Sequence, residues 1–259
     1  MHSIRELFDL SGRTALVTGG SRGLGLQMAE ALGEQGARLV ISARKQDELD
    51  EAVAHLEQRG CRVTACAANL ADKGGVEALA DAALAQLGHV DILVNNAGAT
   101  WGAPAEDHPL EAWDKVMNLN VRSIFLLCQA IGKRSMIPRR YGRIINTASI
   151  AGLAGNGSSH MQTISYNTSK AAVINFTRTL AGEWGQYGIT VNALAPGFFP
   201  SKMTRGMLDS MGDEAAQRAP LRRLGDDEDL KGAVLLFSPS TANILPGRRL
   251  RLTVACRRC

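Results

Sequence analysis

Short apolar runs alternate with longer amphipathic stretches along most of the chain. The apolar runs hold four to six residues each and are nearly uninterrupted, which is typical of strands that helices cover on both faces. We therefore expect strands at Thr14–Thr18, Leu39–Ser42, Val63–Ala67, Ile92–Asn95, Arg143–Thr147 and Thr190–Ala195.

The intervening stretches have helical periodicity. The stretch Asp47–Arg59, for example, places Leu49, Ala52, Val53 and Leu56 on one face. Strand–helix alternation over 259 residues predicts an α/β fold with a doubly wound parallel sheet of the Rossmann-like kind. Because no repeat, low-complexity linker or composition break divides the chain, we expect residues 1–259 to form a single domain.

The net charge of +4 is concentrated at one end of the chain. Five arginines lie in the last twelve residues, and subtracting their charges leaves −1 for the remainder. This near-neutral body also lacks a basic stripe with interleaved aromatic residues. Nucleic acid and anionic membranes are therefore not expected as partners.

Other bulk features indicate a cytoplasmic protein. The sequence has no run of eighteen apolar residues and no apolar leader near Met1, so neither a membrane span nor a secretory signal is expected. Its five cysteines are spaced irregularly, which favours a reducing compartment over a disulfide framework. Cys256 and Cys259 have the spacing of a metal half-site, but no matching pair exists, so no metal is expected.

A glycine-rich turn follows the first predicted strand. It reads TGGSRGLG at residues 18–25 and leads into the helical run Leu26–Leu32. Such glycines allow a tight turn and close backbone approach to a diphosphate, which then lies at the positive end of the helix. An ordinary strand–helix connection is the alternative, but the flanking elements favour a dinucleotide. The expected contacts are Gly19, Ser21, Arg22, Gly23, Leu24 and Gly25.

The end of the second predicted strand bears on which dinucleotide binds. An acidic residue there would accept hydrogen bonds from a ribose 2′-hydroxyl and favour NAD(H). The chain instead reads Ile41-Ser42-Ala43-Arg44-Lys45. Because Arg44 and Arg22 can both reach a 2′-phosphate, NADP(H) is preferred. NAD(H) stays possible if Arg44 and Lys45 are only a solvated strand end and Asp47 caps the next helix.

Several further motifs, in order, resemble the short-chain dehydrogenase/reductase family over about residues 10 to 237. They are NNAG at 95–98, NLNV at 118–121, NTAS at 146–149, YNTSK at 166–170 and NALAPG at 192–197. The resemblance implies a catalytic group made of Asn120, Ser149, Tyr166 and Lys170. It also implies that Lys170 holds the nicotinamide ribose and that Asn120 supports a water-linked proton relay.

The chemistry of a tyrosine and a lysine four residues apart is consistent with this assignment. Positions i and i+4 share a helix face, so Tyr166 and Lys170 can enter one site, although a surface ion face is the usual alternative. A tyrosine with a pKa of about 10 holds its proton tightly. A neighbouring ammonium lowers that pKa, so Tyr166 can exchange a proton with a carbonyl or alcohol oxygen. Ser149 would hydrogen-bond the same oxygen, where negative charge develops.

The resemblance implies further cofactor contacts. Asn69 stands where the family often has an aspartate, beside the adenine, and Ser201 stands near a threonine position that contacts the carboxamide. Asn95 has a second interpretation as a strand-end residue that satisfies backbone groups. The remaining expected cofactor contacts are Leu70, Asn96, Ala97, Gly98, Tyr166, Lys170, Pro196, Gly197 and Phe199.

The substrate side is less specific. Residues 198–215 are interpreted as a mobile apolar lid, or as a helix that packs on its own core. Gly152–Thr163, an inserted loop with His160, is expected near the pocket mouth. The leading function is NADP(H)-dependent reduction of a ketone or 3-oxoacyl substrate. Oxidation of a polyol or a gluconate-type sugar acid is the alternative, and a non-catalytic NADP(H)-binding regulatory or scaffold protein is a third.

The tail at residues 239–259 departs from the family's final strand. Leu250–Cys259 can be encoded by codons that read AVDGGVSAV in a shifted frame, which resembles the family's C-terminus. We therefore hypothesise a frameshift after about Ser238, and an unshifted gene with no nearby insertion or deletion would exclude it. The family's edge strand commonly packs against another subunit, so a homotetramer or dimer is expected, weakened by the tail.

Restoring the family frame after Ser238 should strengthen assembly, because the arginine cluster at the edge is replaced by the family pattern. Size-exclusion chromatography should show more tetramer, and the melting temperature should rise. Equal tetramer content and equal melting temperatures for the two chains would refute this expectation.

Overall fold

A parallel sheet runs through the centre of the molecule, with its strands in the order β3-β2-β1-β4-β5-β6-β7. The structure, a computed structural model, describes residues 3–155, 162–202, 204, 214–217, 219–239 and 249–252. The strands are β1 (Thr14–Thr18), β2 (Arg38–Ala43), β3 (Arg62–Ala67), β4 (Ile92–Asn95), β5 (Gly142–Thr147), β6 (Ile189–Pro196) and β7 (Arg249–Leu252). All six predicted strands are confirmed, with ends that differ by at most one residue.

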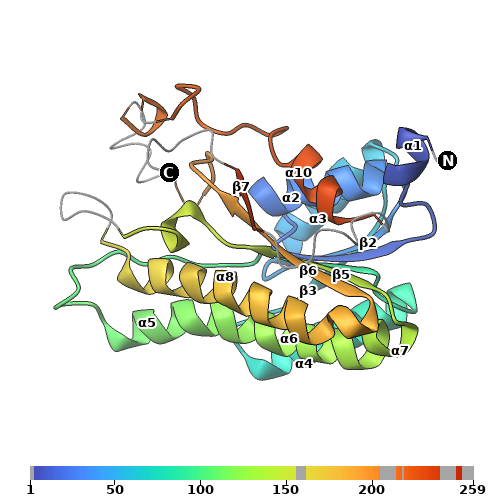
Figure 1. The fold of residues 1–259 in the computed structure, drawn as a ribbon, viewed down its shortest axis with the longest axis horizontal. Coiled ribbons are helices and arrows are strands. Elements are labelled where there is room, and N and C mark those ends of the chain that lie inside the picture. The colour runs from blue at the N-terminus through green and yellow to red at the C-terminus, as the bar shows by residue number, and fades with distance from the viewer. Residues whose placement is uncertain are drawn as a thin grey trace.

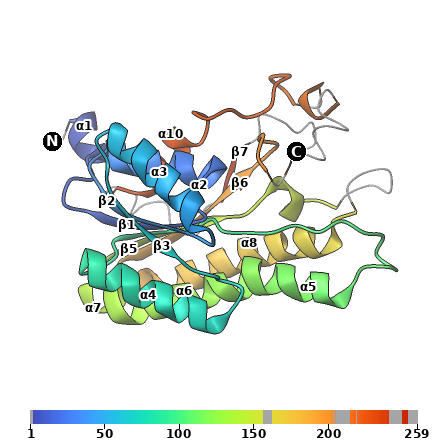
Figure 2. The same ribbon diagram turned by 180° about the vertical axis from the view of Figure 1, so that it is seen from behind.

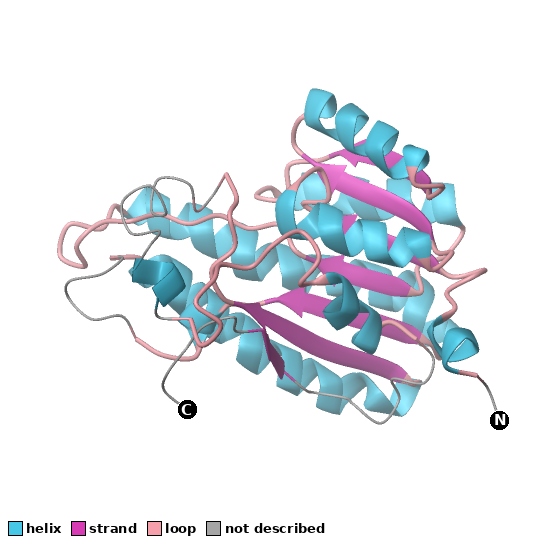
Figure 3. Cartoon of the chain, turned by 90° about the horizontal axis from the view of Figure 1, so that it is seen from above, coloured by secondary structure: helices cyan, strands magenta, loops and turns pink. Residues whose placement is uncertain are grey.

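The strand order reverses beside β1, which pairs with β2 on one side and β4 on the other. Figure 3 shows these strands in magenta between the helices. In a doubly wound sheet, ligands bind beyond the carboxyl ends of the strands at this reversal. The glycine turn follows β1 and the NNAG segment begins in β4, so both motifs lie at that position.

Helices cover both faces of the sheet, as Figures 1 and 2 show. One face carries α1 (Ile4–Phe8), α2 (Gly23–Glu34), α3 (Gln46–Gln58) and α10 (Lys231–Phe237). The other carries α4 (Lys73–Leu87), α5 (Leu110–Met117), α6 (Ser123–Ile131), α7 (Ile137–Arg139) and α8 (Ile164–Trp184). The doubly wound prediction is therefore confirmed. Within the described ranges, no helix has both the length and the apolar character that a membrane span requires.

Alternation along each strand produces two cores. In β1, Leu16 faces the core under α4, α6 and α8, whereas Ala15 and Val17 face the core under α2, α3 and α10. All three are fully buried. A strand buried on both faces has no polar side, which is why the apolar runs in the sequence identify the strands so well.

Helix α3 confirms the predicted helix Asp47–Arg59 to within one residue. The suggestion that Asp47 caps this helix is wrong. Lys45 occupies the N-cap position without a side-chain cap, and Asp47 lies with Glu48 in the first turn. There a carboxylate is stabilised by the positive end of the helix dipole.

The tail supplies the last strand of the sheet. Strand β7 pairs in parallel with β6, from Ala193 opposite Arg249 to Pro196 opposite Leu252. The other tail residues, 240–248 and 253–259, lie outside the described residues. The frameshift and its effect on assembly therefore stay predictions.

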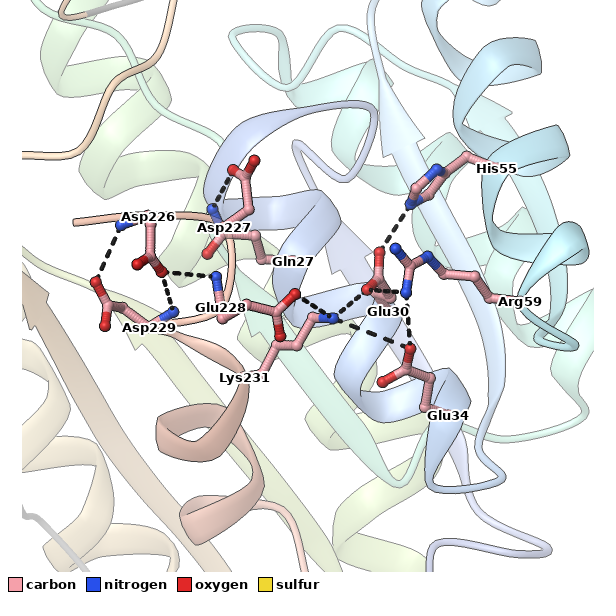
Figure 4. A network of polar contacts seen from close by, with 10 residues as sticks. All are labelled: Gln27, Glu30, Glu34, His55, Arg59, Asp226, Asp227, Glu228, Asp229 and Lys231. Carbon is pink, nitrogen blue, oxygen red and sulfur yellow. Dashed lines mark hydrogen bonds and ion pairs between the residues drawn. The ribbon is translucent and has the colours of Figure 1, made fainter.

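A polar network centred on Glu30 joins α2, α3 and α10 (Figure 4). Glu30 is 5% exposed, and its carboxylate lies 2.8 Å from His55 Nε2 and 3.0 Å from Arg59 Nη1. Lys231 of α10 donates to the same carboxylate. Burial acts to raise the pKa of Glu30, but the hydrogen bonds from Lys231 and His55 outweigh it and lower the pKa. The charged form of Glu30 therefore stabilises the packing of three helices.

Replacing Glu30 with glutamine should cost about 2 kcal/mol of unfolding free energy at neutral pH, between the values for exposed and buried ion pairs. Because folding lowers the pKa of Glu30, its contribution is complete above the unfolded value of about 4.3 and is lost as pH falls through the folded value. Denaturant titrations across pH measure both effects. E34Q, on the same helix but more exposed, is the control, and equal losses in both variants would contradict the assignment.

Candidate active site

The glycine turn after β1 adopts conformations that favour glycine. Gly19 and Gly23 have φ angles of 65° and 52°. A Cβ on Gly25 would lie 2.0 Å from the carbonyl oxygen of Gly19, so no larger residue fits without a backbone shift. Helix α2 begins at Gly23, and the N-cap Arg22 makes no side-chain cap. The first N–H groups of α2 are therefore suited to bind an anion, as a dinucleotide diphosphate requires.

Asn96 braces this turn against two strand ends. Its Nδ2 donates to the carbonyl oxygens of Thr18 at 3.1 Å and of Gly19 at 3.2 Å. The Thr18 Oγ1 accepts from the backbone N–H groups of Asn96 at 2.9 Å and Ala97 at 3.1 Å. Thr147, at the end of β5, donates its hydroxyl to Asn96 Oδ1 at 3.3 Å. These bonds fix β1, β4 and β5 relative to one another at the switch point.

The side chain of Asn95 bonds to other side chains, and not to the backbone groups that its position at the strand end suggested. Its Nδ2 donates to Asn146 Oδ1 at 2.9 Å and approaches Cys128 Sγ at 3.3 Å, and the residue is 3% exposed. The sequence interpretation of Asn95 as a residue that satisfies backbone groups is wrong, because Asn96 makes those bonds. Asn95 instead ties β4 to β5 and α6 inside the core.

Tyr166 and Lys170 lie one turn apart near the start of α8. Lys170 is 4% exposed, and its Nζ donates to the carbonyl oxygen of Thr147 at 2.7 Å. The same nitrogen lies 5.6 Å from the centroid of the Tyr166 ring. Burial lowers the pKa of Lys170 to about 8. The ammonium and the phenol thus occupy one environment, as the i, i+4 spacing predicts.

The pKa of Tyr166 shifts in the direction opposite to the sequence expectation. Burial raises it, and a hydrogen bond with Ser149 lowers it only in part. The expected lowering by the ammonium is therefore wrong for the chain as the structure describes it. Desolvation of the phenolate is the larger effect, and the hydrogen bond with Ser149 does not compensate for it.

Ser149 and Tyr166 meet at the end of β5. Ser149 is 8% exposed and lies directly before the short 3-10 turn η3 (Ile150–Gly152). Its Oγ accepts from the Ala151 N–H at 3.1 Å, which orients the hydroxyl, and it also forms the hydrogen bond with Tyr166. The structure therefore brings Ser149, Tyr166 and Lys170 together.

Asn120 lies in a π-helical turn, η1 (Asn118–Arg122), between α5 and α6. Its Oδ1 accepts from the Ala99 N–H at 2.8 Å, and its Nδ2 donates to Ala99 O and Ser169 Oγ, both at 2.9 Å. A Cβ on Gly98 would lie 3.2 Å from Asn120 Oδ1 and 3.7 Å from Lys170 Nζ. Both amide protons of Asn120 therefore have partners inside the protein, and the proton relay expected at this residue stays a prediction.

The segment after β6 turns back toward the glycine turn. Pro196 ends β6, and the Phe199 ring is 3% exposed and packs against Gly225. Ser201 forms a small turn with Thr204, whose Oγ1 donates to Phe199 O at 2.6 Å. A Cβ on Gly23 would lie 3.9 Å from Ser201 Cβ, so Ser201 faces the phosphate turn. Since Phe199 anchors this segment in the core, its ring is not a surface for a ligand.

The expected adenine contact has a structural role in its own loop. The Asn69 side chain donates to Asp72 Oδ2 at 2.7 Å and accepts from the Ala71 N–H at 3.3 Å. Leu70 is 6% exposed and packs in the core under α4. The remaining expected residues, Ser21 and Leu24 in the glycine turn and Gly197 after β6, are all half-buried.

A cluster of basic residues lies beside the glycine turn. Arg22 Nη1 lies 2.6 Å from Glu48 Oε1, and Lys45 and Lys202 approach the same oxygen at 3.6 Å and 3.7 Å. Arg44 is exposed next to them. The sequence interpretation missed Glu48 and Lys202. The position of Glu48 in the first turn of α3, just after β2, could have suggested a role in this cluster. Nothing in the local sequence indicated that Lys202, which is distant in the chain, would contact it.

Parts of the expected substrate region lie outside the described residues. These are 203 and 205–213 of the predicted lid at 198–215, and 156–161 of the inserted loop, including His160. The lid and the loop therefore stay predictions. The described neighbour of that loop is the segment after β4, where the Ala103 N–H donates to Gln162 O at 2.9 Å.

Replacing Asn120 with alanine should cost about 2 to 4 kcal/mol of unfolding free energy, because it removes the partners of the half-buried Ala99 backbone and of the buried Ser169 hydroxyl. Asn118→Ala, two residues earlier in the same turn, is the control and should cost well under about 1 kcal/mol. Chemical denaturation measures both. A loss at Asn120 no larger than that at Asn118 would show that these bonds do not hold the turn.

Comparison with known proteins places this geometry in a family. Residues 13–211 match the family model described as short chain dehydrogenase. Over 248 residues the chain is 36% identical to gluconate 5-dehydrogenase of Gluconobacter oxydans, covering 95% of this chain and 94% of that one. It is 38% identical over 250 residues to a rhamnolipid-biosynthesis 3-oxoacyl-[acyl-carrier-protein] reductase of Pseudomonas aeruginosa, covering 92% and 96%.

A solved structure agrees with the sequence relatives. Gluconate 5-dehydrogenase from Burkholderia cenocepacia J2315, in complex with NADP and tartrate, superposes with a TM-score of 0.89 at 31% identity, covering 96% of each chain. The family match spans most of the chain, and these relatives align with 92% to 96% of it. The chain therefore belongs to the short-chain dehydrogenase/reductase family of oxidoreductases.

Proposed function

We propose that this protein is an NADP(H)-dependent oxidoreductase that interconverts a ketone and a secondary alcohol, with Tyr166 as general acid and base. The observation that carries the proposal is the environment of Tyr166. Its phenol bonds to Ser149, and the Lys170 ammonium, held by Thr147 O at 2.7 Å, lies 5.6 Å from its ring centroid. The phenol of Tyr166, the hydroxyl of Ser149 and the ammonium of Lys170 thus lie in one site.

Two features of the chain fit the cofactor. The uncapped start of α2 and the open side of Gly23 suit a diphosphate, and Arg22, Arg44, Lys45 and Lys202 suit a 2′-phosphate. The Burkholderia cenocepacia relative was solved with NADP, which supports the same choice. When bound, the nicotinamide supplies or accepts the hydride.

The proton is transferred by side chains of the protein itself. As a carbonyl oxygen gains negative charge, Tyr166 donates its phenolic proton to it, and Ser149 stabilises the oxygen with a hydrogen bond. The phenolate that remains is stabilised by the Lys170 ammonium, which is charged below a pKa of about 8. In the oxidative direction, the phenolate takes the proton from the alcohol.

For the substrate, we favour a medium-sized apolar ketone, with a 3-oxoacyl thioester first. The support is Trp101, whose side chain is 44% exposed. It lies in the same segment as Ala103, whose N–H donates to the carbonyl oxygen of Gln162. Gln162 in turn precedes Tyr166 by four residues. An exposed indole there offers apolar contact area. The Pseudomonas relative is named as a 3-oxoacyl reductase. Sugar-acid oxidation is the second candidate, supported by the name of the Gluconobacter relative.

Assembly and location belong to the same proposal. Phe125 of α6 is 48% exposed and packs edge-on against Phe176 of α8, so the outer face of these helices offers an apolar patch for another copy of the chain. Cys61, Cys66 and Cys128 carry free thiols, consistent with a reducing cytoplasm. We therefore propose a cytoplasmic homo-oligomer.

A substrate panel tests the function. The purified protein is assayed with short 3-oxoacyl thioesters and simple ketones plus NADPH or NADH, and with gluconate and polyols plus NADP or NAD. We expect NADPH-dependent reduction of a 3-oxoacyl thioester to be the fastest reaction. Faster gluconate oxidation would favour the second candidate. Cofactor binding without turnover of any carbonyl or alcohol would indicate the non-catalytic alternative.

A further inference from the structure

One carboxylate oxygen in the cofactor region collects three cations from three separate parts of the chain. Glu48 Oε1 lies 2.6 Å from Arg22 at the start of α2, 3.6 Å from Lys45 before α3, and 3.7 Å from Lys202 after β6. Burial acts to raise the pKa of Glu48, but Arg22, Lys45 and Lys202 outweigh it and lower the pKa. Glu48 is therefore charged and is the shared counter-ion of the cluster.

The charges in this cluster do not balance. A single carboxylate neutralises one of its three cations, which leaves two positive charges without a counter-ion in the cluster. The side chains of Arg22, Lys45 and Lys202 are 47%, 59% and 61% exposed, whereas that of Glu48 is 20% exposed. The cations can therefore reach a second anion without unfolding any element. A phosphate, with about two negative charges at neutral pH, would complete the neutralisation.

Lys202 connects this cluster to the substrate side of the protein. It follows Ser201, which faces Gly23 of the phosphate turn, and both belong to the turn closed by Thr204. The predicted lid at 198–215 begins in this turn. An anion bound by Lys202 would therefore also lie beside the described turn that carries Ser201.

We propose that Glu48 is a place-holder for the 2′-phosphate of NADP(H), and that Lys202, in the turn after β6, is a cofactor-specificity residue that binds this phosphate. The inference rests on the NADP(H) preference stated under the proposed function. Without the phosphate, Glu48 keeps the cations close together. With the phosphate bound, Arg22, Lys45 and Lys202 would contact it as well as Glu48, and Glu48 would compete with it for these cations. NAD(H), which lacks this phosphate, leaves Lys202 on Glu48.

Two adenosine fragments test this without turnover. Isothermal titration calorimetry measures the binding of 2′,5′-ADP, which carries the 2′-phosphate, and of 5′-AMP, which lacks it. E48Q should bind 2′,5′-ADP about fivefold more tightly than wild type, and K202Q about fivefold more weakly, the upper end of the range for one exposed charge pair. Neither variant should change 5′-AMP binding by more than about twofold.

Matched variants separate local contacts from overall charge. E51Q removes an exposed carboxylate from the same helix, and K115Q removes an exposed lysine from α5, so both should leave 2′,5′-ADP binding at the wild-type value. Melting temperatures verify that each variant is folded. Unchanged or weaker 2′,5′-ADP binding in E48Q, or unchanged binding in K202Q, would overturn the inference.

The two levels of the proposal fail in different ways. If wild type binds 2′,5′-ADP no more tightly than 5′-AMP, the NADP(H) preference fails, and the inference fails with it. If wild type prefers 2′,5′-ADP but the Glu48 and Lys202 variants behave like their controls, the inference alone is overturned.

Discussion

The position of the proposed proton donor depends on one buried cation, the ammonium of Lys170, beside the ring of Tyr166. Moving an ammonium out of water costs several kcal/mol unless a partner compensates. The partner here is the carbonyl oxygen of Thr147, 2.7 Å away at the end of β5. This bond fixes the register of α8 against the sheet and so fixes where the phenol lies. The lowered pKa of Lys170, about 8, reflects the remaining cost of burial.

Thr147 also connects the catalytic helix to the phosphate turn. Its carbonyl holds Lys170, and its hydroxyl donates to Asn96, whose amide braces Thr18 and Gly19. Asn120 makes a parallel connection from the segment after β4 to α8 through Ser169. The phosphate turn and the proposed proton donor are thus positioned by the same strand ends, those of β1, β4 and β5. A shift in one strand would displace both, which explains why these polar groups are buried and mutually bonded.

The sequence predicted what depends on local pattern. Apolar runs located the strands, and the motif spacing brought Ser149, Tyr166 and Lys170 together. It failed where the answer depends on distant packing. The separate roles of Asn95 and Asn96 depend on which strand lies beside each, and Lys202 reaches Glu48 only through the return of the chain after β6. The direction of the Tyr166 pKa shift depends on how deeply the phenol is buried relative to its hydrogen bonding with Ser149, and residue spacing alone does not reveal this.

The most direct test of the central claim is single-turnover NADPH oxidation by wild type and Tyr166→Phe with one ketone substrate. The variant keeps the ring and its packing but has no proton to donate. The account predicts that its rate of hydride transfer falls by about 10³-fold, within the range for loss of a general acid, while NADPH binding measured by fluorescence is unchanged. Undiminished hydride transfer in the variant would contradict it.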